Sequence, residues 1–353
     1  MTKKSQEIYS KFGANERAII DKISNNVVRN IVIQLVGFKM KLQWKGWLQY
    51  FIPTPILIGL LLVGAIFYLL ISTLVAWVVW GVAGILLVKM VLDIITVKYK
   101  VRFPESRPSR NDDKKVLDLI RLRTSCRSFQ TKKLQENDLN ELMESVQQHV
   151  AEPKFNTEEI RFEYIANPIR VWPTVNATEF LVAIAPKEYN RLTIVEVGRT
   201  LQKIVIDATR MGLATCWIGP GADHSSITSQ LEGRFDSEKD NVICVCAIGY
   251  KSRYVPLFIQ IFGKKMRKRL PLDSLFFDSH AMDAAIDTSR ELHERFLKGY
   301  ESCQWAPSSY NGQTTRGVVI ADNNAVRRID FMAVTSAKYY AAIESGIWCA
   351  NWE

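Results

Sequence analysis

Residues 46–88 read GWLQYFIPTPILIGLLLVGAIFYLLISTLVAWVVWGVAGILLV and contain no Asp, Glu, Lys or Arg. A helix needs about 20 apolar residues to cross a bilayer, so this stretch is long enough for two crossings. Helices of soluble proteins normally carry charge on the face that meets water. The sequence therefore predicts a chain that is embedded in a membrane through its N-terminal third, with the remainder held at the membrane surface.

The uncharged stretch is best divided into a helical hairpin. We expect helices over residues 52–70 and 74–95, with the reversal near Ser72 and Thr73. Each half is long enough to cross, and a helix satisfies its own backbone polar groups in lipid. Lys89 and Asp93 are four residues apart and can pair on one helix face near the boundary.

Basic residues flank both ends of the predicted hairpin. They are Lys39, Lys41 and Lys45 before it, and Lys98, Lys100 and Arg102 after it. Because basic flanks favour the cytoplasmic side, both ends are expected in the cytoplasm, which requires an even number of spans. The expected protein is thus integral to the membrane, with its soluble domain on the cytoplasmic side.

The apolar stretch has two other interpretations: a signal peptide, and a single membrane helix. A signal peptide is excluded, because the stretch starts some 45 residues into the chain and is too long. One tilted membrane helix followed by a buried helix of a soluble domain stays open as the alternative to the hairpin.

The chain divides into four predicted regions: an amphipathic cytoplasmic segment (1–45), the hairpin (46–97), a linker (98–112) and a large soluble domain (113–353). In the first region apolar residues recur every four positions, at Ile19, Ile23, Val27, Ile31 and Leu35. This spacing predicts one amphipathic helix, which either lies on the membrane or self-associates.

Charge and cysteine content limit the partners and the compartment. A net charge of +10 fits a domain that faces anionic membrane lipid. The densest basic cluster, residues 264–269, has no interleaved aromatic residue, and no helix-turn-helix or zinc-finger spacing occurs, so no nucleic-acid partner is expected. The six cysteines form no paired framework, which fits a reducing compartment. The four histidines have no metal-ligand spacing, so we expect no metal site.

The soluble region mixes helix and strand signals without a regular βα repeat. We expect helices at 116–123, 138–150, 194–211 and 340–353, and strands at 180–185, 242–248 and 317–321. This order predicts an α+β fold.

Three segments in the soluble region carry residue types suited to binding a ligand. The first, Arg123-Thr124-Ser125-Cys126-Arg127, puts two guanidinium groups and two hydroxyls just after a short helix, which suits a phosphate; its alternative is a solvated turn. The second, residues 306–313 (APSSYNGQ), gathers hydroxyls and amides that fit the edge of a heterocycle or a ribityl chain; its alternative is an ordinary polar turn. The third, residues 212–221 (GLATCWIGPG), lets backbone N–H groups approach a ligand closely.

Together, the three segments resemble motifs of the FMN-dependent nitroreductase family: Arg-x-Ser-x-Arg, Ala-Pro-Ser-x-x-Asn-x-Gln and Gly-Leu-(Gly/Ala)-x-Cys-Trp-(Ile/Leu)-Gly. The likeness runs from about Val116 to the end of the sequence. The wide separation of the first two motifs is similar to the branch in which one chain supplies both lobes. The resemblance implies a central mixed sheet flanked by helices, two pseudo-repeated lobes, and no required oligomer.

The resemblance also implies which residues hold FMN. Arg123, Thr124, Ser125 and Arg127 would contact its phosphate and ribityl chain, and Arg269 its phosphate. The flavin or its chain would be held by Pro307, Ser308, Ser309, Asn311 and Gln313. Trp217, Ile218 and Gly219 would lie along the isoalloxazine ring. No protein acid or base is required, so no catalytic side chain is expected.

Two departures from the family pattern bear on activity. Thr314 and Thr315 stand where the family usually has Pro-Trp, and the sequence stops at Glu353, where the family usually continues, so we expect a truncated domain or a fragment. The leading hypothesis is a membrane-anchored FMN oxidoreductase that passes electrons from NAD(P)H to a small-molecule acceptor. The alternative is a flavin-binding or inactive nitroreductase-like interaction module tethered to a membrane.

Overall fold

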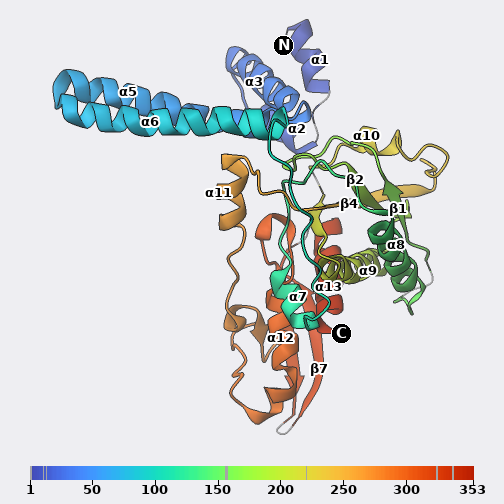
Figure 1. The fold of residues 1–353 in the computed structure, drawn as a ribbon. Coiled ribbons are helices and arrows are strands. Elements are labelled where there is room, and N and C mark those ends of the chain that lie inside the picture. The colour runs from blue at the N-terminus through green and yellow to red at the C-terminus, as the bar shows by residue number, and fades with distance from the viewer. Residues whose placement is uncertain are drawn as a thin grey trace. The chain divides into compact units, whose positions relative to one another are not determined.

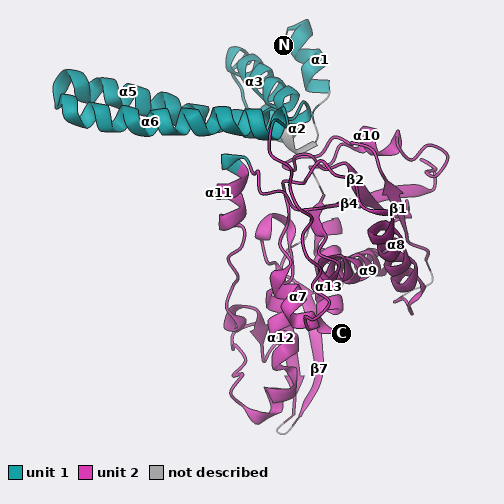
Figure 2. Cartoon of the chain, in the orientation of Figure 1, with its two compact units in different colours: residues 1–101, 256–258 teal, residues 102–255, 259–353 magenta. Residues whose placement is uncertain are grey.

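The computed structural model describes residues 2–10, 12, 14–155, 158–219, 221–322, 325–335 and 338–353. The chain forms two compact units (Figure 2): one comprises residues 1–101 with 256–258, and the other comprises residues 102–255 with 259–353. Their elements are labelled in Figure 1.

The first unit begins with three helices, α1 (Lys3–Ser10), α2 (Ala14–Asp21) and α3 (Asn26–Trp44). They enclose a small core of Phe12, Ile20 and Ile33. The single helix expected through residues 19–35 is wrong. The chain leaves the helix after Asp21, and Asn25 caps α3 by accepting hydrogen bonds from Val27 N and Val28 N. The break has a local cause, because Asn side chains compete for backbone groups and favour helix starts.

Two long apolar helices follow, α5 (Thr54–Leu70) and α6 (Thr73–Asp93). With α4 (Leu48–Phe51) before them and the π-helical turn η1 (Ile94–Lys98) after them, they give two stretches long and apolar enough to cross a membrane, Leu48–Leu70 and Thr73–Lys98. They pack closely at Gly64, where an added Cβ would lie 2.2 Å from Trp80 Nε1. Lys89 and Asp93 form the expected ion pair.

The second unit contains two sheets. The first is antiparallel with the order β1-β2-β4-β3, and the second is mixed with the order β5-β6-β7. The strands are β1 (Arg161–Ile165), β2 (Glu179–Pro186), β3 (Ala214–Ile218), β4 (Asp240–Gly249), β5 (Phe276–Phe277), β6 (Thr315–Ala321) and β7 (Val326–Ala333). The expected α+β class is confirmed, and the strands form two sheets where one central sheet was expected.

Helices complete this unit. They are α7 (Val116–Leu122), α8 (Glu136–Ala151), α9 (Arg191–Arg210), α10 (His224–Thr228), α12 (Leu297–Gln304), α13 (Lys338–Trp352) and the short η2 (Leu272–Ser274), η3 (Glu291–Phe296) and η4 (Ser309–Asn311). Helix α11 (Leu257–Lys265) starts in the first unit and continues in the second. The helix expected at 194–211 is the central α9, which Gly212 ends with a φ of +79°.

The close crossing of α9 and α13 connects the two sheets. Glycine makes it possible on both sides: a Cβ on Gly198 would lie 2.3 Å from Ile343 O, and a Cβ on Gly346 would lie 1.9 Å from Val195 O. Neither position therefore has room for a side chain. The largest apolar core of the unit includes residues from both helices and both sheets.

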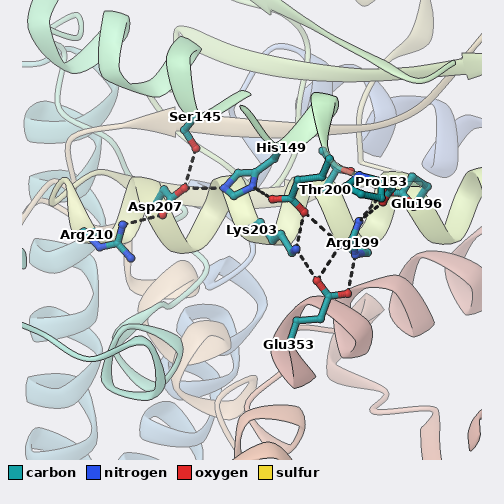
Figure 3. A network of polar contacts seen from close by, with 11 residues as sticks. Ser145, His149, Pro153, Glu196, Arg199, Thr200, Lys203, Asp207, Arg210 and Glu353 are labelled. Atoms are coloured by element: carbon teal, nitrogen blue, oxygen red, sulfur yellow. Dashed lines mark hydrogen bonds and ion pairs between the residues drawn. The ribbon is translucent and has the colours of Figure 1, made fainter. Parts of the chain in front are cut away.

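Polar contacts along α9 reinforce this arrangement (Figure 3). Arg199, almost buried, contacts carboxylates from three parts of the unit: Glu196 at 3.1 Å, Glu152 at 3.1 Å and Glu353 at 2.7 Å. About two turns beyond Arg199 on α9, Asp207 contacts one ring nitrogen of His149 of α8, and the other ring nitrogen contacts Glu152. The polar face of α9 thus binds the ends of α8 and α13.

Candidate functional site

The Arg123–Arg127 segment is held against the first sheet. Arg123 follows the last turn of α7, and its N–H still donates to Leu119 O. Two residues on, Ser125 pairs with Thr215 of β3, and Cys126 N donates to Thr215 O at 2.8 Å. The structure therefore aligns the first predicted segment with the third.

Arg269 brings the second segment toward the first. Its guanidinium lies over the Trp305 ring, 5.7 Å from the centroid, and donates to Trp305 O at 3.4 Å. Trp305 also packs on the small core of α7 residues Leu119 and Ile120. Trp305 thus contacts both Arg269 and the helix that ends at Arg123.

The three arginines form a concentration of positive charge. Burial, and next the charge of Arg269, lower the pKa of the Arg123 guanidinium to about 10, with Arg127 contributing in the same direction. Burial also lowers the pKa of Arg269. Both shifts mean that the surroundings disfavour the charged form, since buried cations are costly without an anionic partner.

Several nitrogens of this arginine cluster have no partner among the described residues. Arg123 is only 6% exposed, and its Nε and Nη1 are buried without a hydrogen bond. The Nε atoms of Arg127 and Arg269 are in the same state. Arg127 also lies over Phe262, 5.1 Å from the ring centroid. Such donors suit a bound anion with several acceptor oxygens, such as a phosphate.

The loop at residues 306–313 is strained. Tyr310, Asn311 and Gln313 all have positive φ angles, of 50°, 56° and 48°. Non-glycine residues pay for this conformation, so the surroundings must fix it, as is common at functional sites.

The amides of this loop bind the segment that contains Arg269. Asn311 Oδ1 accepts a hydrogen bond from Arg269 Nη1, and Asn311 Nδ2 donates to Lys268 O at 2.9 Å. Gln313 Oε1 accepts from Leu270 N at 2.8 Å. The loop therefore holds Arg269 through its two chain neighbours, Lys268 and Leu270, as well as through its guanidinium group.

A buried carboxylate holds the same loop from α13. Glu344 Oε1 accepts from Ser309 N at 2.8 Å, and Glu344 Oε2 accepts from Thr314 Oγ1 at 2.6 Å. Ser308 Oγ accepts from Gln313 N at 2.9 Å and closes the turn from within. Pro307 precedes this turn. A cavity of about 10 Å³, enough for one water molecule, borders Ser308, Gln313 and Glu344.

The third segment ends at a closely packed glycine. Strand β3 carries Trp217, whose Nε1 is buried without a partner among the described residues, and Ile218, which is buried. At Gly219 an added Cβ would lie 2.9 Å from Tyr340 Cε1 of α13. Burial, and next Tyr310, raise the pKa of Tyr340.

The structure thus brings together Arg123, Arg127 and Arg269, while Thr124 and Ser125 are half-buried next to them. Sequence reasoning missed Trp305, Glu344 and Tyr340. They lie outside the motifs or late in the chain, and no local pattern marks them as neighbours of the arginine cluster.

Comparison with known proteins defines the family. The sequence profile described as "Putative TM nitroreductase" matches residues 115–348. The chain belongs to this nitroreductase family. The match covers most of the second unit and confirms the resemblance found in the motifs. No curated protein matches the chain.

Solved structures similar to this nitroreductase-family chain carry related names. A "putative nitroreductase" from Thermotoga maritima is 17% identical, covering 72% of this chain and 86% of its own, with a TM-score of 0.43. A nitroreductase with bound FMN from Bacteroides fragilis is 18% identical. The match covers 41% of this chain and 92% of that one, with a TM-score of 0.33. An FMN-dependent nitroreductase from Clostridium difficile is 20% identical. The match covers 38% of this chain and 87% of that one, with a TM-score of 0.32.

Proposed function

We propose that this protein is a membrane-anchored, FMN-dependent oxidoreductase that takes electrons from NAD(P)H and passes them to a small-molecule acceptor. The observation that carries the proposal is the arginine cluster of a nitroreductase-family chain. In this cluster Arg123 Nε and Nη1, and the Nε atoms of Arg127 and Arg269, are buried without a partner among the described residues. Guanidinium groups with buried, unpaired N–H groups are unfavourable by themselves and become favourable with an anion between them.

The residues present fit FMN at both of its ends. The arginine cluster would hold the phosphate, with Thr124 and Ser125 beside it. The ring would lie along Trp217, Ile218 and Gly219, where Trp217 Nε1, which has no partner among the described residues, is a donor for a polar atom. When bound, FMN supplies the redox chemistry, a hydride taken from NAD(P)H and two electrons passed on. The chain's own part is to bind and orient it, with Asn311, Gln313, Ser308 and Ser309 fixing the loop beside Arg269.

Membrane anchoring is supported by the exposure of the two apolar helices. Only 11% of an 18-residue apolar stretch within Leu48–Leu70 is buried, and only 17% of such a stretch within Thr73–Lys98. A core helix of a soluble protein would be mostly buried. The basic flanks on both sides favour a hairpin whose two ends face the cytoplasm.

The test uses the full-length protein purified in detergent. It should bind FMN, and its flavin absorbance should bleach without oxygen when NADH or NADPH is added. Replacing Arg123 and Arg127 together with Ala removes two charge-assisted partners, each contributing about 1.5–3 kcal/mol. FMN affinity should fall by at least about two orders of magnitude. Arg328→Ala is the matched control, because Arg328 is 65% exposed on β7.

Two results would contradict the proposal in different ways. If the double variant retained stoichiometric FMN, the arginine cluster would not be the phosphate site. A wild-type protein that takes up no FMN would favour the alternative, an inactive nitroreductase-like interaction module tethered to the membrane. Thr314 and Thr315 are the observation that favours this alternative, because they change the loop next to the site.

A further inference from the structure

Helix α3 carries an apolar stripe that no described residue of its own unit covers. Val27, Ile31, Leu35 and Phe38 are 68%, 54%, 62% and 61% exposed. They recur at helical spacing, so they lie on one face of α3. Four large apolar side chains in one exposed row are more than the scattered apolar residues usual on a soluble surface.

The opposite face of α3 is already used for packing. Ile33 is fully buried against Phe12 and Ile20 in the core of the first unit. On the same side, Gly37 faces α1 so closely that an added Cβ would lie 2.5 Å from Ile8 Cγ2. The exposed stripe is therefore a second apolar face, separate from the one that folds the unit.

The charges beside the stripe are all of one sign. At about 100° per residue, Lys39 and Lys41 lie about 80° to either side of the stripe's centre at Ile31. Helix α3 contains no Asp or Glu in its 19 residues. Lysines along both borders of an apolar stripe are typical of a helix that lies in a membrane interface, where their ammonium groups reach the headgroups.

Contacts within the first unit join the C-terminal end of α3 to the base of the apolar hairpin. Lys98 Nζ donates to Lys45 O at 2.8 Å and lies 5.0 Å from the centroid of the Trp47 ring. Trp47 and Tyr99 meet edge to face at 6.3 Å. Tryptophan and tyrosine favour the depth of the lipid headgroups, so α3 ends at that depth if the hairpin crosses.

We propose that α3 lies in the plane of the membrane, with its stripe among the upper acyl chains and Lys39 and Lys41 on anionic headgroups. This proposal rests on the membrane anchoring in the proposed function. A second copy of α3 is the less suitable occupant, because its lysines would face like charges with no carboxylate on the helix to pair them. An anionic lipid surface supplies both the apolar and the negatively charged partner.

The experiment labels single introduced cysteines in the full-length protein reconstituted into vesicles of phosphatidylcholine, with and without phosphatidylserine. Leu35→Cys reports on the stripe, and Asn26→Cys is the matched exposed position on α3 away from it. Leu62→Cys, at a position 60% exposed in α5, reports on the hairpin. The unsubstituted protein measures label on the native cysteines. Accessibility to lipid-soluble and water-soluble quenchers is compared at each position.

We expect lipid-phase quenching at positions 35 and 62 and aqueous quenching at position 26. Changing Lys39 and Lys41 together to Gln should lower the lipid-to-water quenching ratio at position 35 severalfold in phosphatidylserine vesicles and little in phosphatidylcholine alone. Aqueous quenching at position 35 with lipid quenching at 62 overturns the proposal for α3 only. Aqueous quenching at 62 overturns the anchoring on which it rests. Position 35 shielded from both quenchers, with crosslinks between copies, assigns the stripe to self-association and also overturns the proposal.

Discussion

Thr314 Oγ1 donates a hydrogen bond of 2.6 Å to Oε2 of Glu344, a buried carboxylate of α13. The other oxygen of Glu344 accepts from Ser309 N at 2.8 Å. One carboxylate thus binds the strained loop at Ser309 and just past its end, at Thr314. The family pattern leads one to expect proline where Thr314 stands, and proline fixes the backbone covalently. Here a hydroxyl and a buried acid provide the restraint.

Thr314→Val should therefore weaken FMN binding without unfolding the protein. A hydrogen bond to a charged group contributes about 1.5–3 kcal/mol, so a freed loop should cost at least about tenfold in FMN affinity, measured by quenching of flavin fluorescence. Glu344→Ala, which removes both bonds, should cost more. Thr228→Val is the matched control, because Thr228 Oγ1 donates to two exposed backbone carbonyls of its own helix, those of His224 and Ser225. Equal affinities for all three variants and the wild type would mean that the loop does not contribute to binding.

Gln313 is expected to act through Arg269. Since Gln313 Oε1 accepts from Leu270 N, Gln313→Ala should release the segment that contains Arg269 and lower FMN affinity. A double-mutant cycle checks this route. If Gln313 only positions Arg269, then combining Gln313→Ala with Arg269→Ala should be no worse than Arg269→Ala alone. Fully additive losses would instead show that Gln313 contacts the ligand independently.

Gly346→Ala should destabilise the second unit. The new Cβ would lie 1.9 Å from Val195 O, so α9 and α13 would have to separate. Overpacking of this kind typically costs about 1–3 kcal/mol, and backbone on the opposing side makes the upper end the expectation. Gly263→Ala is the control: it lies in α11 with no atom within 4 Å of its Cβ position, so it should be neutral or slightly stabilising. Thermal unfolding distinguishes them, and similar melting temperatures for both variants would contradict the tight crossing.

Arg199→Leu should also destabilise this unit, because it leaves Glu196 as a buried carboxylate without its main cation. Glu196 is 1% exposed. Removing one partner of a buried ion pair costs about 3–5 kcal/mol, which lowers the melting temperature of a domain this size by about 6–20 °C. Arg328→Leu removes an exposed ion pair with Asp330 and should change the melting temperature little. A small effect of Arg199→Leu would mean that the network in Figure 3 is solvated.

His149 should give the stability of the second unit a pH dependence. The hydrogen bond to Asp207 raises the pKa of His149, an effect that burial opposes and the bond to Glu152 reinforces. Burial raises the pKa of Asp207, but bonds from His149 and Ser145 outweigh it and the net pKa is lowered. The stabilisation by charged His149 is therefore complete below the ordinary histidine pKa of about 6.5 and is lost as the pH rises through the raised value. Wild type should melt above His149→Gln at pH 6, and the gap should close at alkaline pH. A gap that does not change with pH would contradict this assignment.

Local patterns predicted the longest helices and several of the longer strands, and missed most of the shorter elements. The helix expected at 138–150 is α8, and the strands expected at 180–185 and 242–248 are the cores of β2 and β4. These segments have strong periodic or continuous apolar patterns, which depend on neighbours within a few residues. The single helix expected through residues 19–35 is wrong because of one local feature. The apolar spacing continues across Ser24 and Asn25, but Asn25 caps the start of a new helix there. Polar capping outweighed periodicity there.

By itself, the sequence determined the uncharged stretch that forms the two long apolar helices, the α+β class and, through its motifs, the family. These depend on composition and on the spacing of residues that are close in the sequence, which are the same in any fold of this chain. Only the tertiary structure decided that Trp305 joins Arg269 to the helix before Arg123, that Glu344 holds Thr314, and that Gly198 and Gly346 permit α9 and α13 to cross. Each of these pairs is far apart in the chain. Contact between such residues depends on how the core packs, and no periodicity along the sequence encodes it.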